Sequence, residues 1–247
     1  WFKENDEWRP RAERADRTLR LLNDERLSAN VASALYAAPL SMSVTQLESY
    51  AGCPFLHFAK HGLRATRREE FRAGARDKTG SLLHDMLCML GKDILSGAVD
   101  LHEFDEAASV EWTRRAFDAL EQEETGYYAW LGSTASGRAI RERLTDNVAA
   151  ATRNMARSLN QSGFSLNTVE GELPPTTLER DKKTISLVGR VDRVDVAHLD
   201  GFDAARVIDY KSSQKDTSID QIYYARRLQL AAYLLAVCEN PKQFGCD

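Results

Sequence analysis

The spacing of apolar residues divides the chain into a helical first part and a later part that contains strands. In residues 5–38, apolar residues are interspersed among many charges, which is typical of one or two helices that pack on a partner surface. From Gly80 to Ile94, apolar residues recur every three or four positions, the mark of a helix with one buried face. Residues 104–120 and 136–162 also follow a helical pattern. The first two thirds of the chain are therefore predicted to be mainly α-helical.

Another helix is predicted to begin at Ser43 and to end near Cys53-Pro54. Ser43 and Gln46 have the spacing of a capping box, in which the hydroxyl and the amide side chain each bind a backbone N–H group of the other residue.

After Gly163 the pattern changes to alternating β-branched residues. The alternation around residues 166–173, 184–196 and 206–210 predicts three strands. Residues 219–238 return to helical spacing, which predicts a helix packed on the resulting sheet.

Composition fits a chain that buries a full core, with 247 residues and 43% hydrophobic content. No run of about 18 apolar residues and no charged-then-apolar leader is present, so we expect neither a membrane span nor a secretory signal, and a cytoplasmic location. The four cysteines form no C-x-x-C pair, which argues against a zinc ribbon and a disulfide framework and favours reduced thiols. Trp1 in place of an initiator Met, and Cys246 so near the end, favour a piece of a larger polypeptide.

The net charge of -4 does not indicate a nucleic-acid binder, but a global sum hides local fields. One stretch carries a local excess of four positive charges and is a candidate phosphate-binding surface. The alternative is an ordinary solvated helix face. The basic residues of this stretch are Lys60, Arg64, Arg67, Arg68, Arg72, Arg76 and Lys78.

The strongest chemical signal is a predicted hairpin around Asp200-Gly201. Asp-Gly favours a two-residue type I′ turn, which pairs residues whose numbers add up to 401. Asp192 and Asp209 satisfy this condition, so the register sets them opposite each other with Cβ atoms about 4.5 to 5.5 Å apart. Lys211 points to the same side of the strand as Asp209.

Two opposed carboxylates would destabilise a sheet unless a cation offsets their charge. Hard oxygen ligands on a rigid frame suit Mg²⁺ or Mn²⁺. Lys211 could then stabilise the negative charge that develops on a phosphate during cleavage. The alternative is a surface hairpin with ordinary charges on its solvated face.

Four further segments share a pattern with known nucleases. Gly80–Leu87 resembles the G-x-x-L-H-x-x-L helix of RecB-family nucleases, Glu170 lies on the strand before the hairpin, and Gln229–Tyr233 matches a Q-x-x-x-Y motif. Residues 43–55 resemble the segment that introduces the nuclease domain in AddB-type subunits of bacterial helicase-nucleases. From Ser43 to about Leu235, the chain thus resembles the RecB-like family of PD-(D/E)XK nucleases.

This resemblance implies an α/β fold with a restriction-endonuclease-like core, in which helices flank a central mixed sheet, plus a large N-terminal helical portion. It also implies Mg²⁺-dependent DNA cleavage in DNA end resection and recombinational repair, with a helicase-nuclease partner subunit and no membrane. Carried over to this chain, the resemblance implies His84, Asp192 and Asp209 as metal ligands. It implies Glu170 as a further acidic residue and Lys211 as the catalytic lysine. The DNA-facing residues would be Gln229 and Tyr233, together with the basic Arg64, Arg67 and Arg68. Glu172 shares a strand face with Glu170, so the sequence leaves both open for the acidic role.

One departure concerns iron-sulfur binding. Many AddB-type domains use a cysteine of the C-P-F segment together with three cysteines near the C-terminus. Cys53 fits the first position, but Cys238 and Cys246 do not complete the second group. An iron-sulfur cluster would therefore require a longer parent protein.

The expected organisation is a helical segment, residues 1–40, that belongs to a neighbouring domain of the parent protein, followed by the nuclease domain, residues 41–247. Within that domain, residues 41–163 are expected to be helical, and residues 164–247 to hold the catalytic sheet and helix. The alternative function is an inactive nuclease-like module that binds DNA or a partner helicase subunit.

Overall fold

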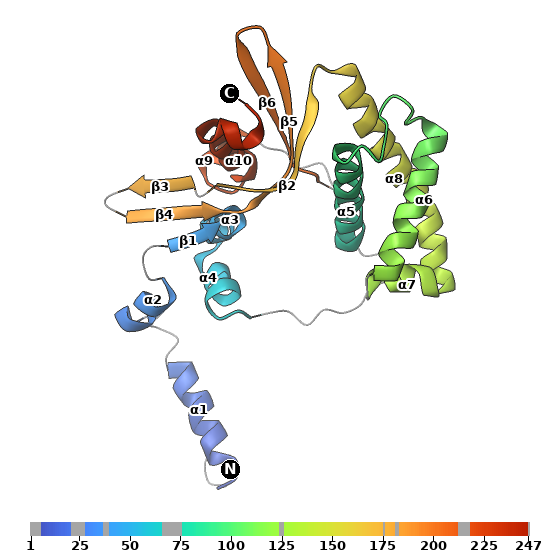
Figure 1. Cartoon of the computed structure of the whole chain (residues 1–247). Helices are drawn as coiled ribbons and strands as arrows, with labels where there is room; N and C mark the ends of the chain where they lie inside the picture. The colour runs from blue at the N-terminus through green and yellow to red at the C-terminus, as the bar shows by residue number, and fades with distance from the viewer. Residues whose placement is uncertain are drawn as a thin grey trace. The chain divides into compact units, whose positions relative to one another are not determined.

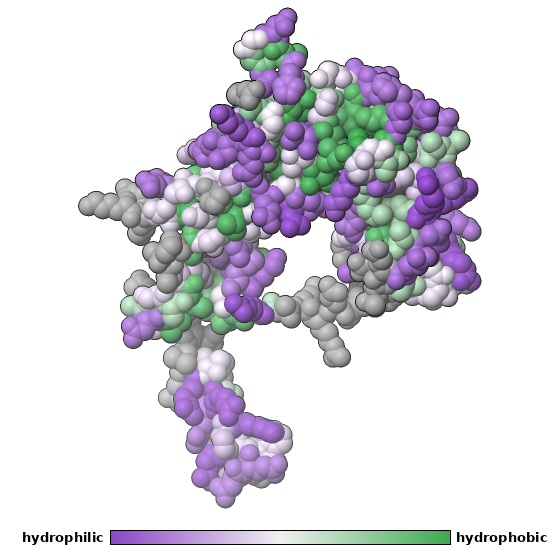
Figure 2. Space-filling view, viewed as in Figure 1, coloured by the Kyte–Doolittle hydropathy of each residue, from purple (hydrophilic) through white to green (hydrophobic). Residues whose placement is uncertain are grey.

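The computed structural model describes residues 6–20, 28–36, 40–65, 76–123, 126–174, 176–180, 183–211 and 218–246 (Figure 1). The chain separates into two compact units, Trp1–Leu40 and Ser41–Asp247. The first unit contains the helices α1 (Arg9–Arg20) and α2 (Ala29–Leu35), as the charge-rich pattern predicts. Figure 2 shows mainly hydrophilic residues over α1, at the bottom of the view.

The strand β1 (Leu40–Ser43) begins at the last residue of the first unit, and the predicted helix after Ser43 is α3 (Val44–Gly52) of the second unit. Both hydrogen bonds of the capping box are present, with Gln46 N donating to Ser43 Oγ over 3.2 Å and Ser43 N donating to Gln46 Oε1 over 2.8 Å. The chain turns at Cys53 into the short helices α4 (Pro54–His57) and η1 (Phe58–Gly62).

Four longer helices follow and share a core. On α5, the predicted apolar face is buried, and Leu82, Met86 and Leu90 pack with Phe117 and Val148 of the neighbouring helices. Because α5 begins at Arg76, it is four residues longer at its N-terminus than the pattern predicts. The helix α7 is an addition to the predicted helices. The four helices are α5 (Arg76–Leu95), α6 (Glu106–Glu123), α7 (Tyr127–Ser133) and α8 (Ala135–Gln161). No helix in the described part of the chain is long and apolar enough to cross a membrane.

Within the described residues, the strands form two three-stranded sheets, ordered β1-β4-β3 and β2-β5-β6. In the second sheet both strand pairs are antiparallel. The stretch predicted as one strand over residues 184–196 is interrupted at Gly189, so its two parts belong to different sheets. The strand β3 is an addition to the three predicted strands. The strands after Gly163 are β2 (Ser165–Glu172), β3 (Thr176–Arg180), β4 (Lys183–Val188), β5 (Arg190–Leu199) and β6 (Phe202–Ile208).

The predicted register of the β5-β6 hairpin is confirmed, from Leu199 opposite Phe202 to Arg193 opposite Ile208. The predicted type I′ turn is wrong, because φ is positive at Gly201 (+91°) and not at Asp200. The register survives this difference since the loop still has two residues, which fixes the pairing of the flanking strands.

The β2-β5-β6 sheet has helices on both sides (Figure 1). On one side, α10 (Gln229–Glu239) packs its Tyr233 and Val237 against Val194 and Val196 of β5. On the other side, α5 approaches β2 so closely that a Cβ at Gly91 would lie 2.6 Å from Val169 Cγ2. Glycine at this position therefore permits the contact that brings α5 beside the end of the sheet.

The C-terminal region contains more than the single helix that its pattern predicts. It has α9 (Ile219–Tyr223), α10 and the short 3-10 helix η2 (Pro241–Phe244). Between α9 and α10, Ala225 has a φ of +55°, a left-handed conformation that ends a helix.

A buried ionic network lies within β5 and β6. Asp195 is fully buried and accepts hydrogen bonds from Arg193 over 2.6 and 2.8 Å and from Arg206 over 2.7 Å. The Arg193 side chain is only 3% exposed, so its charge depends on this carboxylate for compensation.

Candidate active site

Five segments that are distant in the sequence supply the candidate site. His84 comes from α5, Glu170 from β2 and Asp192 from β5. Asp209 and Lys211 follow directly after β6, and Gln229 is the first residue of α10. These six of the predicted site residues thus lie at one end of the β2-β5-β6 sheet, where α5 adjoins it.

His84 lies at the centre of one half of the site. Its Nε2 atom is 3.2 Å from Glu170 Oε1 and 3.3 Å from Asp192 Oδ1, and its Nδ1 atom is 3.6 Å from Asp85 Oδ1. Hydrogen bonds to Asp192 and Asp85 raise the pKa of His84 from its usual 6.5 to about 12. Without a metal ion, this imidazole is therefore protonated and offsets the surrounding carboxylates.

Asp192 is held by groups on two sides. Burial alone would raise its pKa, but hydrogen bonds from His84 and from the backbone N–H of Tyr210 lower it. The Tyr210 amide donates to Asp192 Oδ2 over 2.7 Å, just beyond the last ladder pair of the hairpin. The charge of Asp192 is thus stabilised by groups of the protein itself, and not only by the cation that two opposed carboxylates predict.

Glu170 and Glu172 differ sharply, although the pleat predicted a shared face. Glu170 has a φ of +53°, so the regular alternation of β2 breaks at this residue. Its side chain is 22% exposed, points to His84, and accepts a hydrogen bond from Arg190 over 3.2 Å. Glu172 is 85% exposed and lies 3.9 Å from Arg190. Of the two glutamates, Glu170 is therefore the one that lies beside His84.

Lys211 forms the other half of the site. Its ammonium donates to Asp209 over 2.7 to 3.0 Å, as the shared strand side predicts, and to Gln229 Oε1 over 3.0 Å. Gln229 in turn donates to the Tyr233 hydroxyl over 3.4 Å. Tyr233 is only 5% exposed, so the expectation that it faces DNA does not fit. Its ring packs in the core and supports Gln229 from behind, because i and i+4 lie on one helix face.

The candidate basic stretch is described only in part. Lys60 and Arg64 are exposed, and Arg64 has a positive φ of 53°. Arg67, Arg68 and Arg72 lie outside the described residues, so their contribution remains a prediction.

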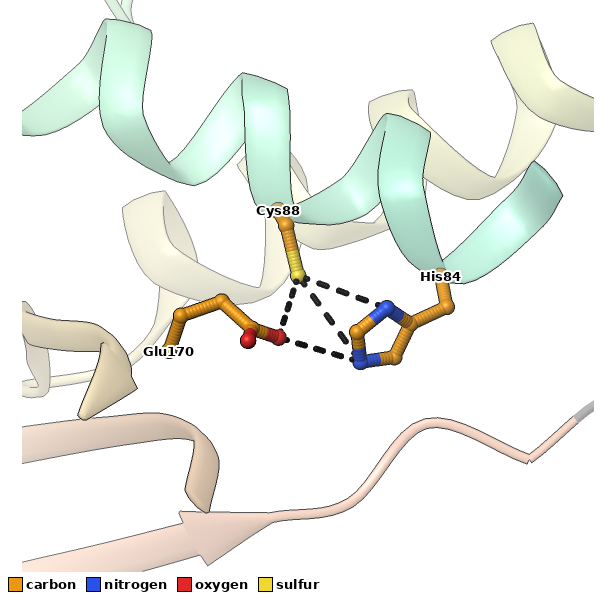
Figure 3. Close-up of side chains that lie close together, drawn as sticks. All are labelled: His84, Cys88 and Glu170. Atoms are coloured by element: carbon orange, nitrogen blue, oxygen red, sulfur yellow. Dashed lines mark hydrogen bonds and ion pairs between the residues drawn. The ribbon is translucent and has the colours of Figure 1, made fainter. Parts of the chain in front are cut away.

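Two residues that contact the site were not found from the sequence. Glu48 of α3 accepts hydrogen bonds from the Leu228 and Gln229 amides over 2.6 and 3.1 Å, and so caps the N-terminus of α10. Cys88 places Sγ 3.2 Å from Glu170 Oε1 and follows His84 by one helical turn (Figure 3). The i, i+4 spacing of His84 and Cys88 was the signal that could have revealed this sulfur.

The other cysteines lie elsewhere. Cys53 Sγ accepts a hydrogen bond from Leu56 N and caps α4, Cys238 is exposed, and Cys246 is buried in the core beside α10. Within the described residues, the one group of three or more side chains with ligand atoms in reach of a common metal ion is His84, Cys88 and Glu170.

Chemically, the site offers carboxylate oxygens from Asp192, Asp209 and Glu170 together with one imidazole. These ligand types suit a hard divalent cation such as Mg²⁺ or Mn²⁺, and Asp192 and Asp209 lie outside the group whose ligand atoms are all within 4.8 Å of one another. The ammonium of Lys211 beside Asp209 adds a positive charge of the kind that stabilises a phosphate in a transition state.

Comparison with known proteins identifies relatives of this chain. The chain is 32% identical over 248 residues to the B-type subunit of an ATP-dependent helicase/deoxyribonuclease of Geobacillus thermodenitrificans, and the match covers 96% of the chain and 21% of that protein. The proteins of the same name from Anoxybacillus flavithermus and Clostridium tetani are 31% and 26% identical, over 96% and 97% of the chain. The chain thus spans about a fifth of the length of these relatives.

The family comparison covers nearly the whole second unit. Residues 41–246 match the PD-(D/E)XK nuclease superfamily. This range includes every residue that we assign to the site, from Glu48 to Tyr233. The chain therefore belongs to the PD-(D/E)XK nuclease superfamily.

Proposed function

We propose that this chain is a divalent-metal-dependent nuclease that hydrolyses phosphodiester bonds in DNA. The observation that carries this proposal is the convergence of two groups of side chains at one end of a sheet. In the first, His84 lies within 3.3 Å of both Glu170 and Asp192. In the second, Lys211 lies 2.7 Å from Asp209. Tyr210 links the two groups. Its backbone N–H donates to Asp192, and its neighbours in the sequence are Asp209 and Lys211.

In this proposal His84, Asp192 and Asp209 hold the metal ion, with Glu170 as a further acidic group. Mg²⁺ or Mn²⁺, when bound, would polarise the phosphate and lower the pKa of a bound water. Asp192 is suited to such a role because its low pKa keeps it ionised. Arg190 and the Tyr210 amide fix the orientation of Glu170 and Asp192.

Lys211 has a separate role. Its ammonium is held between Asp209 and Gln229, so it is oriented before DNA binds. A preorganised cation of this kind stabilises the negative charge that develops on the phosphate in the transition state. Gln229 is a positioning residue for Lys211, and Tyr233 and Glu48 hold Gln229 in place.

DNA would be bound partly by the basic stretch. Lys60 and Arg64 are exposed, as a phosphate-binding surface requires, and Arg67 and Arg68 continue the stretch in the sequence. Affinity supplied by such residues falls with rising salt concentration because phosphate contacts release counterions.

The names of the relatives suggest a larger setting. We propose that the chain is the nuclease domain of a longer protein that works with a helicase-nuclease partner subunit on DNA ends, in resection and recombinational repair. Residues 1–40 would then belong to a neighbouring part of that protein. The similarity to B-type subunits of helicase/deoxyribonucleases over 96% or 97% of the chain supports this assignment.

The test is a cleavage assay on single-stranded DNA labelled at the 5′ or the 3′ end, with Mg²⁺, with Mn²⁺ and with a chelator. The parental chain should cut only with a divalent ion, and Asp192→Asn and Asp209→Asn should not cut. Asp200→Asn is the matched control, because Asp200 is an exposed aspartate in the turn of the same hairpin. DNA binding without cleavage in every metal would instead support a nuclease-like binding module.

A further inference from the structure

Cys88 supplies a sulfur atom that the proposed nuclease chemistry does not use. Its Sγ lies 3.2 Å from Glu170 Oε1 and 3.8 and 3.9 Å from the two ring nitrogens of His84 (Figure 3). The same Glu170 oxygen lies 3.2 Å from His84 Nε2. A thiol, an imidazole and a carboxylate therefore converge, with one ligand atom of each within 4.8 Å of the others.

The separations between these atoms fit a small tetrahedral ion. Zn²⁺ binds cysteine sulfur at about 2.3 Å and nitrogen or carboxylate oxygen at about 2.0 to 2.2 Å. In a tetrahedral site, nitrogen and oxygen ligands at such distances lie about 3.3 to 3.6 Å apart, and sulfur lies about 3.5 to 3.7 Å from nitrogen or oxygen. The observed separations are 3.2 Å for nitrogen and oxygen, 3.2 Å for sulfur and oxygen and 3.9 Å for sulfur and nitrogen, which differ from these ranges by about 0.1, 0.3 and 0.2 Å.

The kind of ligand also discriminates between metals. Thiolate sulfur is a soft ligand that favours Zn²⁺ and similar ions, whereas Mg²⁺ prefers hard oxygen ligands. The donor set of His84, Cys88 and Glu170 thus differs in preference from the oxygen-rich set around Asp192 and Asp209.

The surroundings hold these ligands in place and leave a route for an ion. Cys88 is buried on the same face of α5 as His84, and the second oxygen of Glu170 is fixed by Arg190. The side chains of His84 and Glu170 are 30% and 22% exposed, so the cluster opens to solvent on their side. Contacts of this kind, which orient a ligand from behind, raise metal affinity.

We propose that His84, Cys88 and Glu170 form a site for Zn²⁺ or a similar thiophilic divalent ion, and that its occupancy inhibits the nuclease. On binding, the Cys88 thiol and the His84 imidazolium each release a proton to the solvent. The inhibitory part rests on the proposed function, in which His84 is a ligand of the catalytic ion. Nε2 of a neutral imidazole has one lone pair, so His84 cannot serve both ions through this atom at the same time.

Binding is tested with Co²⁺ as a spectroscopic stand-in for Zn²⁺, on the whole chain. Co²⁺ bound to a thiolate gives an intense sulfur-to-metal charge-transfer absorption. We expect this band in the parental chain and in Cys238→Ser, an exposed cysteine elsewhere on the molecule, and its loss in Cys88→Ser. Absence of the band from the parental chain, or its persistence in Cys88→Ser, would overturn the proposal.

Because Cys88 is buried, Glu170→Gln provides a second variant that keeps the sulfur. It removes one ligand from a partly exposed position, so calorimetry should show Zn²⁺ binding weakened at least about tenfold. Unchanged Zn²⁺ affinity in a folded Glu170→Gln chain would contradict the assigned ligand set.

The inhibitory part is tested by titrating Zn²⁺ into a cleavage assay with excess Mg²⁺. Each variant is compared with its own rate without Zn²⁺, and Cys88→Ser should need at least about tenfold more Zn²⁺ for half inhibition. Equal sensitivity of Cys88→Ser and the parental chain would refute the competition. A chain without nuclease activity in any metal would refute the proposed function and the inhibition, and the Co²⁺ spectrum would still decide whether the metal site exists.

Discussion

Replacing Lys211 with methionine separates a role in the reaction from a role in folding. The Lys211 side chain is 36% exposed and its partner Asp209 is 15% exposed. An ion pair in such a position contributes about 0.2 to 1 kcal/mol to stability. The hydrogen bond to Gln229 adds about 0.5 to 1.5 kcal/mol. For a chain of this size each kcal/mol lowers the melting temperature by about 2–4 °C. Lys211→Met should therefore stay folded at 25 °C.

The effect on cleavage should be larger. Loss of one preorganised group that stabilises transition-state charge lowers a rate by about 10² to 10³, or about 2.7 to 4 kcal/mol. Metal affinity should stay within about threefold, since removal of a nearby cation favours metal binding to the carboxylates. Lys211→Arg should not restore the rate, because the planar guanidinium differs in shape from a compact ammonium.

The assay is single-turnover cleavage of end-labelled DNA, with Mn²⁺ affinity measured by calorimetry on the same samples. Lys242→Met is the control, because Lys242 is an exposed lysine of η2. A folded Lys211→Met chain that cleaves at the parental rate would refute the reasoning and leave Lys211 as a surface residue of the hairpin.

Three further predictions concern charged groups in and near the site. Asp192→Ala should abolish cleavage and also destabilise the metal-free chain by about 1 to 3 kcal/mol, because the Tyr210 amide loses its acceptor. Thermal melts compared with those of the control Asp200→Ala measure this loss of stability, and an Asp192→Ala chain more stable than the parental chain would contradict the prediction. The folded pKa of His84 lies above its unfolded value of 6.5, so its stabilising effect is complete below that pH and is lost as pH rises toward about 12. In a chelator, the stability difference between the parental chain and His84→Ala should therefore shrink from about pH 6 to about pH 9, as denaturant titrations would show; a growing difference would reverse the sign. Asp195→Ala should destabilise the chain by about 3 to 5 kcal/mol, since Arg193 would keep a buried charge without compensation. A stability loss under about 1 kcal/mol in a denaturant titration would contradict this and would mean that solvent reaches Arg193.

The sequence by itself determined the features that depend on neighbours within a few residues. The capping box follows from the three-residue spacing of Ser43 and Gln46, and the buried face of α5 from apolar residues three or four positions apart. The register of the β5-β6 hairpin follows from its two-residue loop. The placement of Asp209 and Lys211 on one side follows from the same alternation. Such patterns are local, so they survive even where the turn type is different from the one predicted.

The tertiary structure decided which of these groups meet, because those contacts join residues far apart in the chain. Glu170 is distinguished from Glu172 by a left-handed residue in β2, a conformation that no alternation pattern indicates. The Cys88 sulfur reaches Glu170 across 82 positions, because the close packing of α5 on β2 brings them together. Glu48 caps α10 across 180 positions, because α3 lies against α10. Local spacing fixes the side on which a residue points, whereas the packing of helices on the sheet fixes what it meets there.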